Sequence, residues 1–410
     1  MSRRRSMALA GFIGAVAMLL AGCGSSGASN SGSSLSSESA GGTGSPAMGE
    51  PIVIGQVGGF SGPISAAHHL DQDTLAAWGQ WVNANGGING HPVKIISKDD
   101  RGDPSVSVSM VKSLVEEDHV IALVGVADQL TESSWAPYVK EKGIPVIGGQ
   151  AATDVWTTNP VFFPGAATYQ SSKFGLAAAA KAAGAKTLGM FICTSSPTCA
   201  DVPPKVEAQA DKLGIKWTIT QGGAPNAADY TAPCLAMKQA DPDAVAMGVD
   251  PSTATKLATT CKVQGLHPTY TMVSVTVDST LASQSVFDGA VGATDVFPWV
   301  YDGPETKDFR SAMSEHYPKA LSNGNEMVGT EWVAGQLFKA AASKVQGDIT
   351  SESLLDAMYT LGPNFDLGGL MPPYTYTKGQ PTPATPCMFI AKVAGGKWTA
   401  PNGLTTVCGS

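Results

Sequence analysis

Residues 52–63 read IVIGQVGGFSGP and decide the fold class. A short apolar run that ends in a glycine-rich turn is typical of a buried strand followed by a tight loop. A helix is expected over 71–83, because Leu75, Trp78 and Val82 recur at helical spacing. A second strand is expected at 93–97. Strands that alternate with helices in this way predict a parallel sheet covered on both faces.

The alternation continues along the chain and restarts after residue 168. Further helices are expected over 104–115, 131–142, 171–183, 202–213, 233–239, 252–264, 309–316, 330–345 and 351–359. Further strands are expected over 121–126, 144–147, 187–192, 215–220, 244–248, 269–273 and 388–393. The sequence therefore predicts two α/β lobes, with ligand sites at the carboxyl ends of the strands.

Length and composition fit two lobes and exclude several classes of protein. The chain has 410 residues, of which 43% are hydrophobic and 15% charged, with a net charge of −8. The hydrophobic content excludes intrinsic disorder. The acidic balance argues against nucleic acid as a partner, since phosphate binding needs clustered Lys and Arg. After residue 22 no apolar run reaches the length of a membrane span.

The first residues have the features of an export signal. Three arginines, Arg3 to Arg5, precede an apolar stretch at 7–20, and Leu20-Ala21-Gly22-Cys23 follows. This order resembles a bacterial lipoprotein signal, in which 1–22 is removed and Cys23 carries lipid. A plain secretory signal or an uncleaved anchor helix are the alternatives. Removing the arginines leaves 23 basic and 34 acidic residues, a net charge of −11.

Residues 23–49 are predicted to be a lipidated, Gly/Ser-rich tether. Of the 26 residues after Cys23, seventeen are Gly or Ser and one, Glu38, is charged. Such a segment buries too little surface to offset its ordering entropy, and as a flexible coil it reaches roughly 28 Å. We expect an exported protein that is lipid-anchored to the outer face of the membrane, or periplasmic, and that contacts the membrane only through its anchor.

Six cysteines remain after Cys23, which implies three disulfides and allows fifteen connectivities. Order along the chain favours neighbours: Cys193–Cys199, Cys234–Cys261 and Cys387–Cys408. A metal site or a nucleophile is the competing interpretation. The chain has no C-x-x-C spacing and only six histidines, so we expect no metal and no cofactor.

Several ordered motifs resemble the leucine/isoleucine/valine type of substrate-binding protein from ABC importers. They are Phe60-Ser61-Gly62-Pro63, WVNANGGING at 81–90, Asp99-Asp100, Asp103-Pro104, Gly125, and GIPVI at 143–147. The resemblance covers about residues 50 to 400 and is tighter in the first half. It implies the type I periplasmic binding protein fold, with two Rossmann-like lobes of parallel sheet joined by three crossovers. Lobe 1 would be 50–167 plus 299–365, and lobe 2 would be 168–298 plus 366–410.

The same resemblance implies a set of ligand-binding residues, found by counting from the matched glycines. In the first lobe they are Gln129, Gln150 and Ala152, with Thr153 adjacent, and His68 after the first strand; in the second lobe they are Asp250 and Ser274. Phe60 and Ser61 are added because the flanking glycines permit close backbone contact with a ligand, and packing of the turn is their alternative role. Many amino-acid binders have an acid for the ligand's ammonium group at the place of Ser274. Asp250 or Asp128 would replace it here, or the ligand carries no amine.

Physical chemistry suggests one anion site within this set. The helix that begins near Thr131 directs its N–H groups and positive dipole end at the loop 126–130, and Gln129 and Thr131 can add hydrogen bonds. The alternatives are structural. Thr131 would simply cap its helix, Gln129 would be solvated, Gln150 and Thr153 would form a turn, and Asp250 would cap the helix after it.

The resemblance implies a function without catalysis. We expect a monomer that binds a small carboxylate-bearing metabolite, a branched-chain or related amino acid, and delivers it to an ABC permease with a separate ATPase. The chain has no phosphate-binding G-x-x-x-x-G-K-[ST] run and no G-x-S-x-G, H-E-x-x-H or suitably placed G-x-G-x-x-G motif, so an enzyme is the weaker interpretation. A ligand-sensing receptor component, or a binder of an aromatic acid or short amide, remains an alternative.

Overall fold

The computed structural model describes residues 47–62, 64–194, 197–225 and 227–409. The predicted signal peptide, Cys23 and most of the predicted tether lie outside these residues. The end of that tether lies against the folded chain, because the amides of Met48 and Gly49 donate to the carbonyl oxygen of Gly90 at 3.1 and 3.0 Å. Within the described ranges, no helix combines the length and the apolar character that a bilayer span requires.

The first sheet has five parallel strands in the order β2-β1-β3-β4-β5. They are β1 Ile52–Gly58, β2 Val93–Asp99, β3 Leu123–Val126, β4 Val146–Gly149 and β5 Phe162–Phe163. The helices between them are α1 Ser65–His68, α2 Asp71–Ala84, α3 Pro104–Glu116, α4 Glu132–Lys142 and α5 Val155–Thr158. Strands and helices alternate as the sequence predicts.

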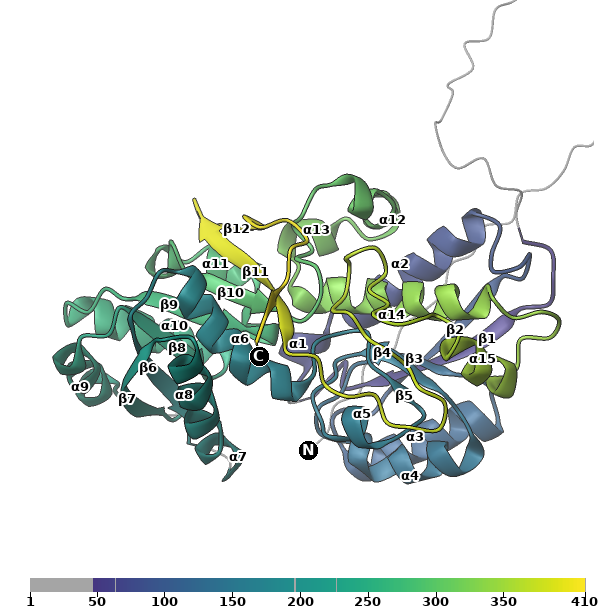
Figure 1. Ribbon diagram of the computed structural model, residues 1–410, viewed down its shortest axis with the longest axis horizontal. Helices are drawn as coiled ribbons and strands as arrows, with labels where there is room; N and C mark the ends of the chain where they lie inside the picture. Colours follow the sequence, from purple (N-terminus) through teal and green to yellow (C-terminus); the bar gives the residue numbers. More distant parts are fainter. Residues whose placement is uncertain (1–46, 63, 195–196, 226, 410) are drawn as a thin grey trace, which may run out of the picture. The chain divides into compact units, whose positions relative to one another are not determined.

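Helices cover both faces of this sheet, which explains why its strands are almost continuously apolar. Ile54 belongs to the buried cluster on the face of α2 and of α14 (Glu326–Ala342), together with Trp78. Val57, three residues later and on the opposite face, belongs to the cluster with Leu114 of α3 and Trp135 of α4. Figure 1 shows the strands between these two pairs of helices.

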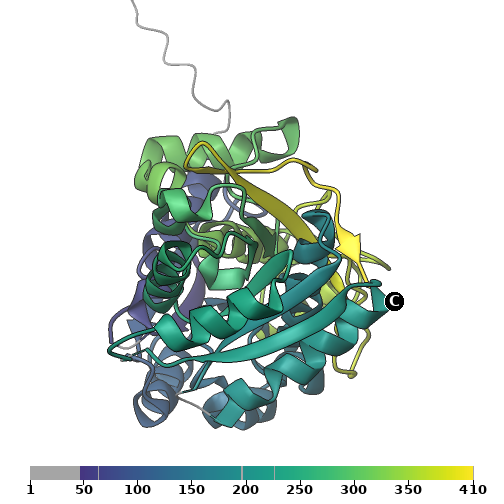
Figure 2. The same ribbon diagram turned by 90° about the vertical axis from the view of Figure 1, so that its left-hand side faces the viewer.

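The second sheet follows the order β7-β6-β8-β9-β10-β11-β12, and β13 pairs with β11. Its strands are β6 Thr187–Cys193, β7 Lys216–Gly223, β8 Ala244–Gly248, β9 Thr269–Val273, β10 Val291–Thr294, β11 Cys387–Ala394, β12 Lys397–Thr399 and β13 Val407–Cys408. The first five in spatial order are parallel, and β11 is antiparallel to β10, β12 and β13. Figure 2 shows β11, in yellow, beside strands from the middle of the chain.

The remaining helices surround this sheet or return to the first one. They are α6 Tyr169–Ala182, α7 Pro197–Ala200, α8 Val202–Lys212, α9 Thr231–Ala240, α10 Pro251–Val263, α11 Ser279–Ala282, α12 Lys307–His316, α13 Lys319–Asn323 and α15 Ser351–Met358, with short 3₁₀ helices at Ser274–Thr276, Ser285–Phe287 and Pro304–Thr306. Helix α14 packs against β3, β4 and α2, so the chain returns to the first sheet after β10.

The chain passes between the sheets three times, as the resemblance implies, and hydrogen bonds join the three crossovers. These are 164–168 after β5, 295–325 after β10 and 359–386 after α15. The amide of Ala167 donates to the carbonyl oxygen of Asp295 at 2.8 Å, and that of Phe297 to Leu370 at 3.0 Å. The hydroxyl of Tyr374 donates to the carbonyl oxygen of Ala166 at 2.7 Å. The lobe boundaries 50–167 plus 299–365 and 168–298 plus 366–410 stay a prediction.

Helix α14 approaches the first sheet so closely that only glycine fits at two contact points. A Cβ on Gly148, at φ +61°, would lie 2.5 Å from the Cα of Ala334. A Cβ on Gly335 would lie 2.3 Å from the ring of Trp78 in α2. Real Cβ atoms do not approach other heavy atoms this closely, so these glycines set the distance between α14 and its neighbours.

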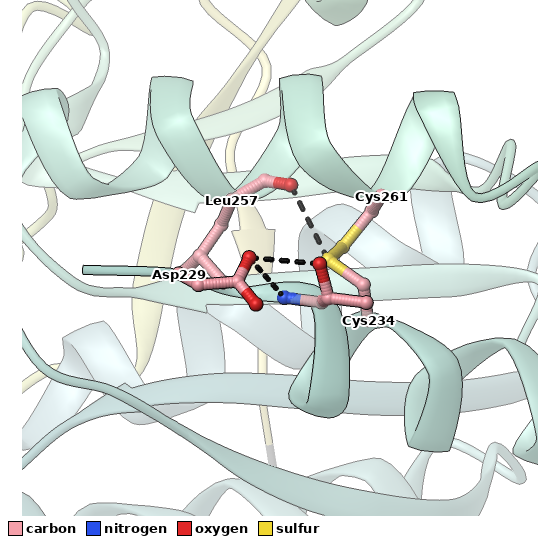
Figure 3. Close-up of a disulfide and its surroundings, with 5 residues drawn as sticks. Asp229, Cys234, Leu257 and Cys261 are labelled. Atoms are coloured by element: carbon pink, nitrogen blue, oxygen red, sulfur yellow. Dashed lines mark hydrogen bonds between the residues drawn. A yellow bond between two sulfur atoms is a disulfide. The ribbon is translucent and has the colours of Figure 1, made fainter. Parts of the chain in front are cut away.

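The structure contains three disulfides, Cys193–Cys199, Cys234–Cys261 and Cys387–Cys408, which join the neighbours that the sequence favours. Cys234–Cys261 links α9 to α10 in the core, with both residues fully buried (Figure 3). Asp229, just before α9, accepts from the amide and hydroxyl of Thr231 at 3.0 and 2.7 Å. All three disulfides lie in or beside elements of the second sheet.

Candidate functional site

A cavity of about 740 Å³ lies where strands of both sheets end. Its wall from the first sheet comes from residues after β1, β3 and β4, and its wall from the second sheet from residues after β6, β8, β9 and β10. Because parallel strands bring their carboxyl ends to one edge, the loops that follow them meet at a single site. The cavity is large enough for a small organic ligand.

The lining is largely apolar and carries negative rather than positive charge. Its titratable residues are His69, Tyr169, Asp250, Asp278 and Asp295, and none of the described lining residues is Lys or Arg. The lining also includes the side-chain oxygen of Gln150, which is buried and accepts no hydrogen bond. Three carboxyl groups and an unsatisfied amide are therefore the strongest polar features that a ligand would meet.

Five of the predicted binding residues line this cavity, and they come from both sheets. They are Gln129, Gln150, Ala152, Asp250 and Ser274. Gln129 is exposed, whereas Gln150 is 5% exposed. Their role in binding stays a prediction, but the structure brings all five to one place.

The other five predicted residues are not among those that line the cavity, and hydrogen bonds account for four of them. Ser61 Oγ donates to Asp99 at 2.5 Å, in the turn beside Phe60. Thr153 donates to the carboxylate of Glu132. His68 is fully buried, with its Nδ1 2.8 Å from Asp71. The neighbouring His69 lines the cavity instead.

The expected anion site at the start of α4 is occupied by a side chain of the protein. Asp128 accepts from the amides of Leu130 and Thr131 at 2.6 and 3.3 Å, and Thr131 Oγ1 also donates to Asp100 at 3.0 Å. Burial, together with neighbouring Asp100, raises the pKa of Asp128 to about 7. The protein's own carboxyl group thus already binds the two amides just before the helix, and an external anion at this helix start stays a prediction.

Asp250 combines the two roles that the sequence leaves open. It accepts from the amides of Ser252 and Thr253, both at 3.0 Å, as the N-cap of α10, and it also lines the cavity. Burial raises its pKa, but the hydrogen bonds from Thr253 and Ser252 outweigh this, so its pKa is lowered overall. Asp250 is therefore ionised at neutral pH and partly neutralised by the helix end.

The sequence analysis missed one group at the site, the acidic pair of Asp295 and Glu326. Asp295 follows β10 and lines the cavity, and Glu326 is the first residue of α14. The two carboxyl groups lie close enough that each changes the pKa of the other, and the nearby Ser274 lowers the pKa of both. The sequence offered one signal for Asp295: if 291–294 is recognised as a strand, Asp295 is the first residue after its carboxyl end.

Comparison with known proteins agrees with this architecture. A family model described as periplasmic binding protein matches residues 51–397. A fatty acid ABC transporter substrate-binding protein from Thermomonospora curvata superimposes with a TM-score of 0.72 at 19% identity, covering 90% of this chain and 96% of that one. A leucine-binding protein from Thermotoga maritima superimposes with a TM-score of 0.67 at 14% identity, covering 87% and 99%. At these identities the superpositions establish the fold.

Curated relatives match over shorter stretches. The substrate-binding protein BasB of a chemotactic signal transduction system in Halobacterium salinarum is 34% identical over 98 residues, which is 22% of this chain and 23% of that protein. The chain spans about a quarter or less of the length of the curated relatives it matches. The family assignment rests on the match to the family model, which covers most of the chain. This chain therefore belongs to the periplasmic binding protein family.

Proposed function

We propose that this chain is an extracytoplasmic solute-binding lipoprotein that captures a small ligand between its two lobes and delivers it to an ABC permease. The observation that carries the proposal is the cavity of about 740 Å³ at the strand ends, with walls from both sheets. Its apolar lining and few polar groups suit a small metabolite. The permease and its separate ATPase are the expected partners, and the protein acts as a monomer.

The arrangement also supports a mechanism. A ligand that touches residues of both lobes binds the closed form more tightly than the open form, so it shifts the equilibrium toward closure. The three hydrogen-bonded crossovers are the connections at which such a motion would occur. A permease that recognises only the closed form would then distinguish loaded from empty protein.

The proposed ligand is a carboxylate-bearing metabolite, a branched-chain or related amino acid, with Gln129 and Gln150 as candidate partners for its polar groups. The unpartnered oxygen of Gln150 favours a ligand that carries a hydrogen-bond donor. An aromatic acid or short amide is the alternative ligand. The carboxylate of an aromatic acid would meet the three lining carboxyl groups and no lining cation among the described residues.

A second candidate function is ligand sensing without transport. The match to a substrate-binding protein of a chemotactic signal transduction system favours it. Uptake separates the two functions. Deleting the gene abolishes ligand uptake in the transport case and leaves uptake intact, with loss of the response, in the sensing case.

Ligand capture is tested by mass spectrometry of whatever co-purifies with the protein, followed by a thermal-shift screen of amino acids, aromatic acids and short amides. We expect a stabilising ligand, and weaker binding in Gln150→Ala and Asp250→Ala variants that keep the fold. A protein that no compound stabilises, or that converts a compound to product, would contradict the proposal. Anchoring is tested separately, since Cys23→Ala should release the protein from the membrane fraction.

A further inference from the structure

The acidic pair at the cavity wall has unsatisfied hydrogen-bonding capacity. Asp295 is 7% exposed and lines the cavity, and its Oδ1 atom has no hydrogen-bond partner. Glu326 is 2% exposed, and neither of its carboxyl oxygens has a partner. A buried carboxylate oxygen without a donor costs free energy, so an unpaired carboxyl group aimed into a cavity points to a donor supplied from outside.

Other charged groups near Asp295 do not supply that donor. Lys173 of α6 is close enough to lower the pKa of Asp295, but its Nζ donates to the carbonyl oxygen of Tyr169. Burial and then the charge of Lys205 lower the pKa of Lys173 to about 6, so it is mostly neutral at pH 7. Burial and then the charge of Asp295 raise the pKa of Tyr374, whose hydroxyl donates to the carbonyl oxygen of Ala166 at 2.7 Å.

The two acids differ in their pKa shifts and in their position, since only Asp295 lines the cavity. Two ionised carboxylates can only accept hydrogen bonds, so they repel unless one holds a proton. Burial and the charge of Asp295 raise the pKa of Glu326 well above its usual range. Burial also raises the pKa of Asp295, but the neighbouring Glu326 and Ser274 oppose this. Glu326 is therefore the acid of the pair that takes up a proton more readily.

We propose that Asp295, supported by Glu326, binds a protonated amino group of the ligand, so that the cavity selects an amine attached to an apolar body. This inference rests on the proposed capture of a small solute and names the chemical class of that solute. An ammonium group supplies three donors and the missing positive charge. The apolar remainder of the cavity, which has no described Lys or Arg in its lining, accepts the body of the ligand.

Two sets of three probes test the amino group while the apolar body stays constant. The first set is leucine, isocaproate and isoamylamine, and the second is phenylalanine, hydrocinnamate and phenethylamine. Titration calorimetry with the full mature protein measures each Kd. We expect the amine-bearing members of at least one set to bind and the acid without an amine to bind on the order of tenfold to a hundredfold more weakly, the range for a hydrogen bond to a charged group.

Three isosteric variants locate the effect. Asp295→Asn should raise the Kd of the amine-bearing probe by on the order of tenfold to a hundredfold. Glu326→Gln should raise this Kd much less, because a glutamine amide is neutral and can donate to Asp295, as a protonated Glu326 can. Glu331→Gln is the matched control: Glu331 lies on the same helix, is fully buried with a raised pKa, and does not line the cavity. It should leave the Kd unchanged, and circular dichroism verifies that each variant is folded.

The outcomes separate this inference from the proposed function. Equal Kd values for an acid and its amine-bearing counterpart, or an unchanged Kd in Asp295→Asn, would overturn the role of Asp295 while leaving solute capture intact. Binding by none of the six probes would also overturn it. The proposed function depends instead on the wider ligand screen and on uptake.

Discussion

The disulfide Cys234–Cys261 offers a prediction whose size follows from the chain. It closes a loop with a sequence separation of 27 residues, for which the chain-entropy relation gives about 3.5 kcal/mol of stabilisation. Both sulfur atoms lie in the core, so the variant Cys234→Ala/Cys261→Ala also loses packing. We expect its free energy of unfolding to fall by about 3.5 kcal/mol or more.

The other two disulfides provide an internal scale. Cys387–Cys408, with a separation of 21, should contribute about 3.3 kcal/mol, and Cys193–Cys199, with a separation of 6, about 2.2 kcal/mol. Urea unfolding followed by far-UV circular dichroism measures all three double alanine variants. Similar m-values would establish that the same cooperative unit unfolds in each.

Two results would refute the reasoning. One is a loss below about 1.5 kcal/mol for Cys234→Ala/Cys261→Ala, far less than loop closure alone predicts. The other is a larger loss for the short Cys193–Cys199 loop than for the 27-residue separation. Either result would mean that these disulfides do not stabilise the protein mainly by lowering the conformational entropy of the unfolded chain.

Three further predictions concern packing and buried charge. Gly148→Ala should cost about 3 kcal/mol or more, because its Cβ meets Ala334, whereas Gly143→Ala, at φ +65° with open space, should cost about 1 kcal/mol; equal losses in urea unfolding would contradict this. Burial and then the charge of Asp71 raise the pKa of Glu331, so the stability that this side chain contributes is present at low pH and is lost as the pH rises above the ordinary range of a glutamate. The Tm of Glu331→Gln should therefore rise relative to that of wild type as the pH increases, and a pH-independent difference would contradict this. Lys173 should act in the opposite direction, because its pKa is lowered to about 6 and the unfolded chain therefore binds the extra proton above that pH, so that stability rises with pH. The variant Lys173→Met should show a smaller rise in stability between about pH 6 and pH 9, and an unchanged slope would contradict this.

Elements with strong local patterns could be predicted from the sequence. The helix expected over 71–83 is observed as Asp71–Ala84, because its apolar spacing and the following Asn-Gly-Gly turn are both local. The strand Val291–Thr294 was missed, since four residues carry no recognisable periodicity and their order comes from neighbouring strands. The strand at 388–393 was predicted, but its antiparallel pairing depends on tertiary contacts that no local pattern encodes.

In the candidate site too, residues fixed by local patterns could be predicted and those that depend on tertiary contacts could not. Counting from glycines brings Gln129, Gln150 and Ser274 to the cavity, because the strand ends they follow are fixed by the fold. The anion site at α4 stays a prediction, and the sequence did not reveal that Asp128, four residues before the helix begins, accepts from the amides of Leu130 and Thr131. The pair of Asp295 and Glu326 could not be predicted, since 31 positions separate two residues that meet only after the second crossover has folded.

The late position of β11 in the chain affects how the protein can be made. Its residues, Cys387–Ala394, pair with β10, which is complete almost a hundred residues earlier. Until the last part of the chain is available, β10 presents an open edge to which any other extended polypeptide can add. A nascent or translocating chain of this protein is therefore in most need of a chaperone just before its synthesis ends, and a truncation that removes β11 should aggregate rather than yield a smaller working protein.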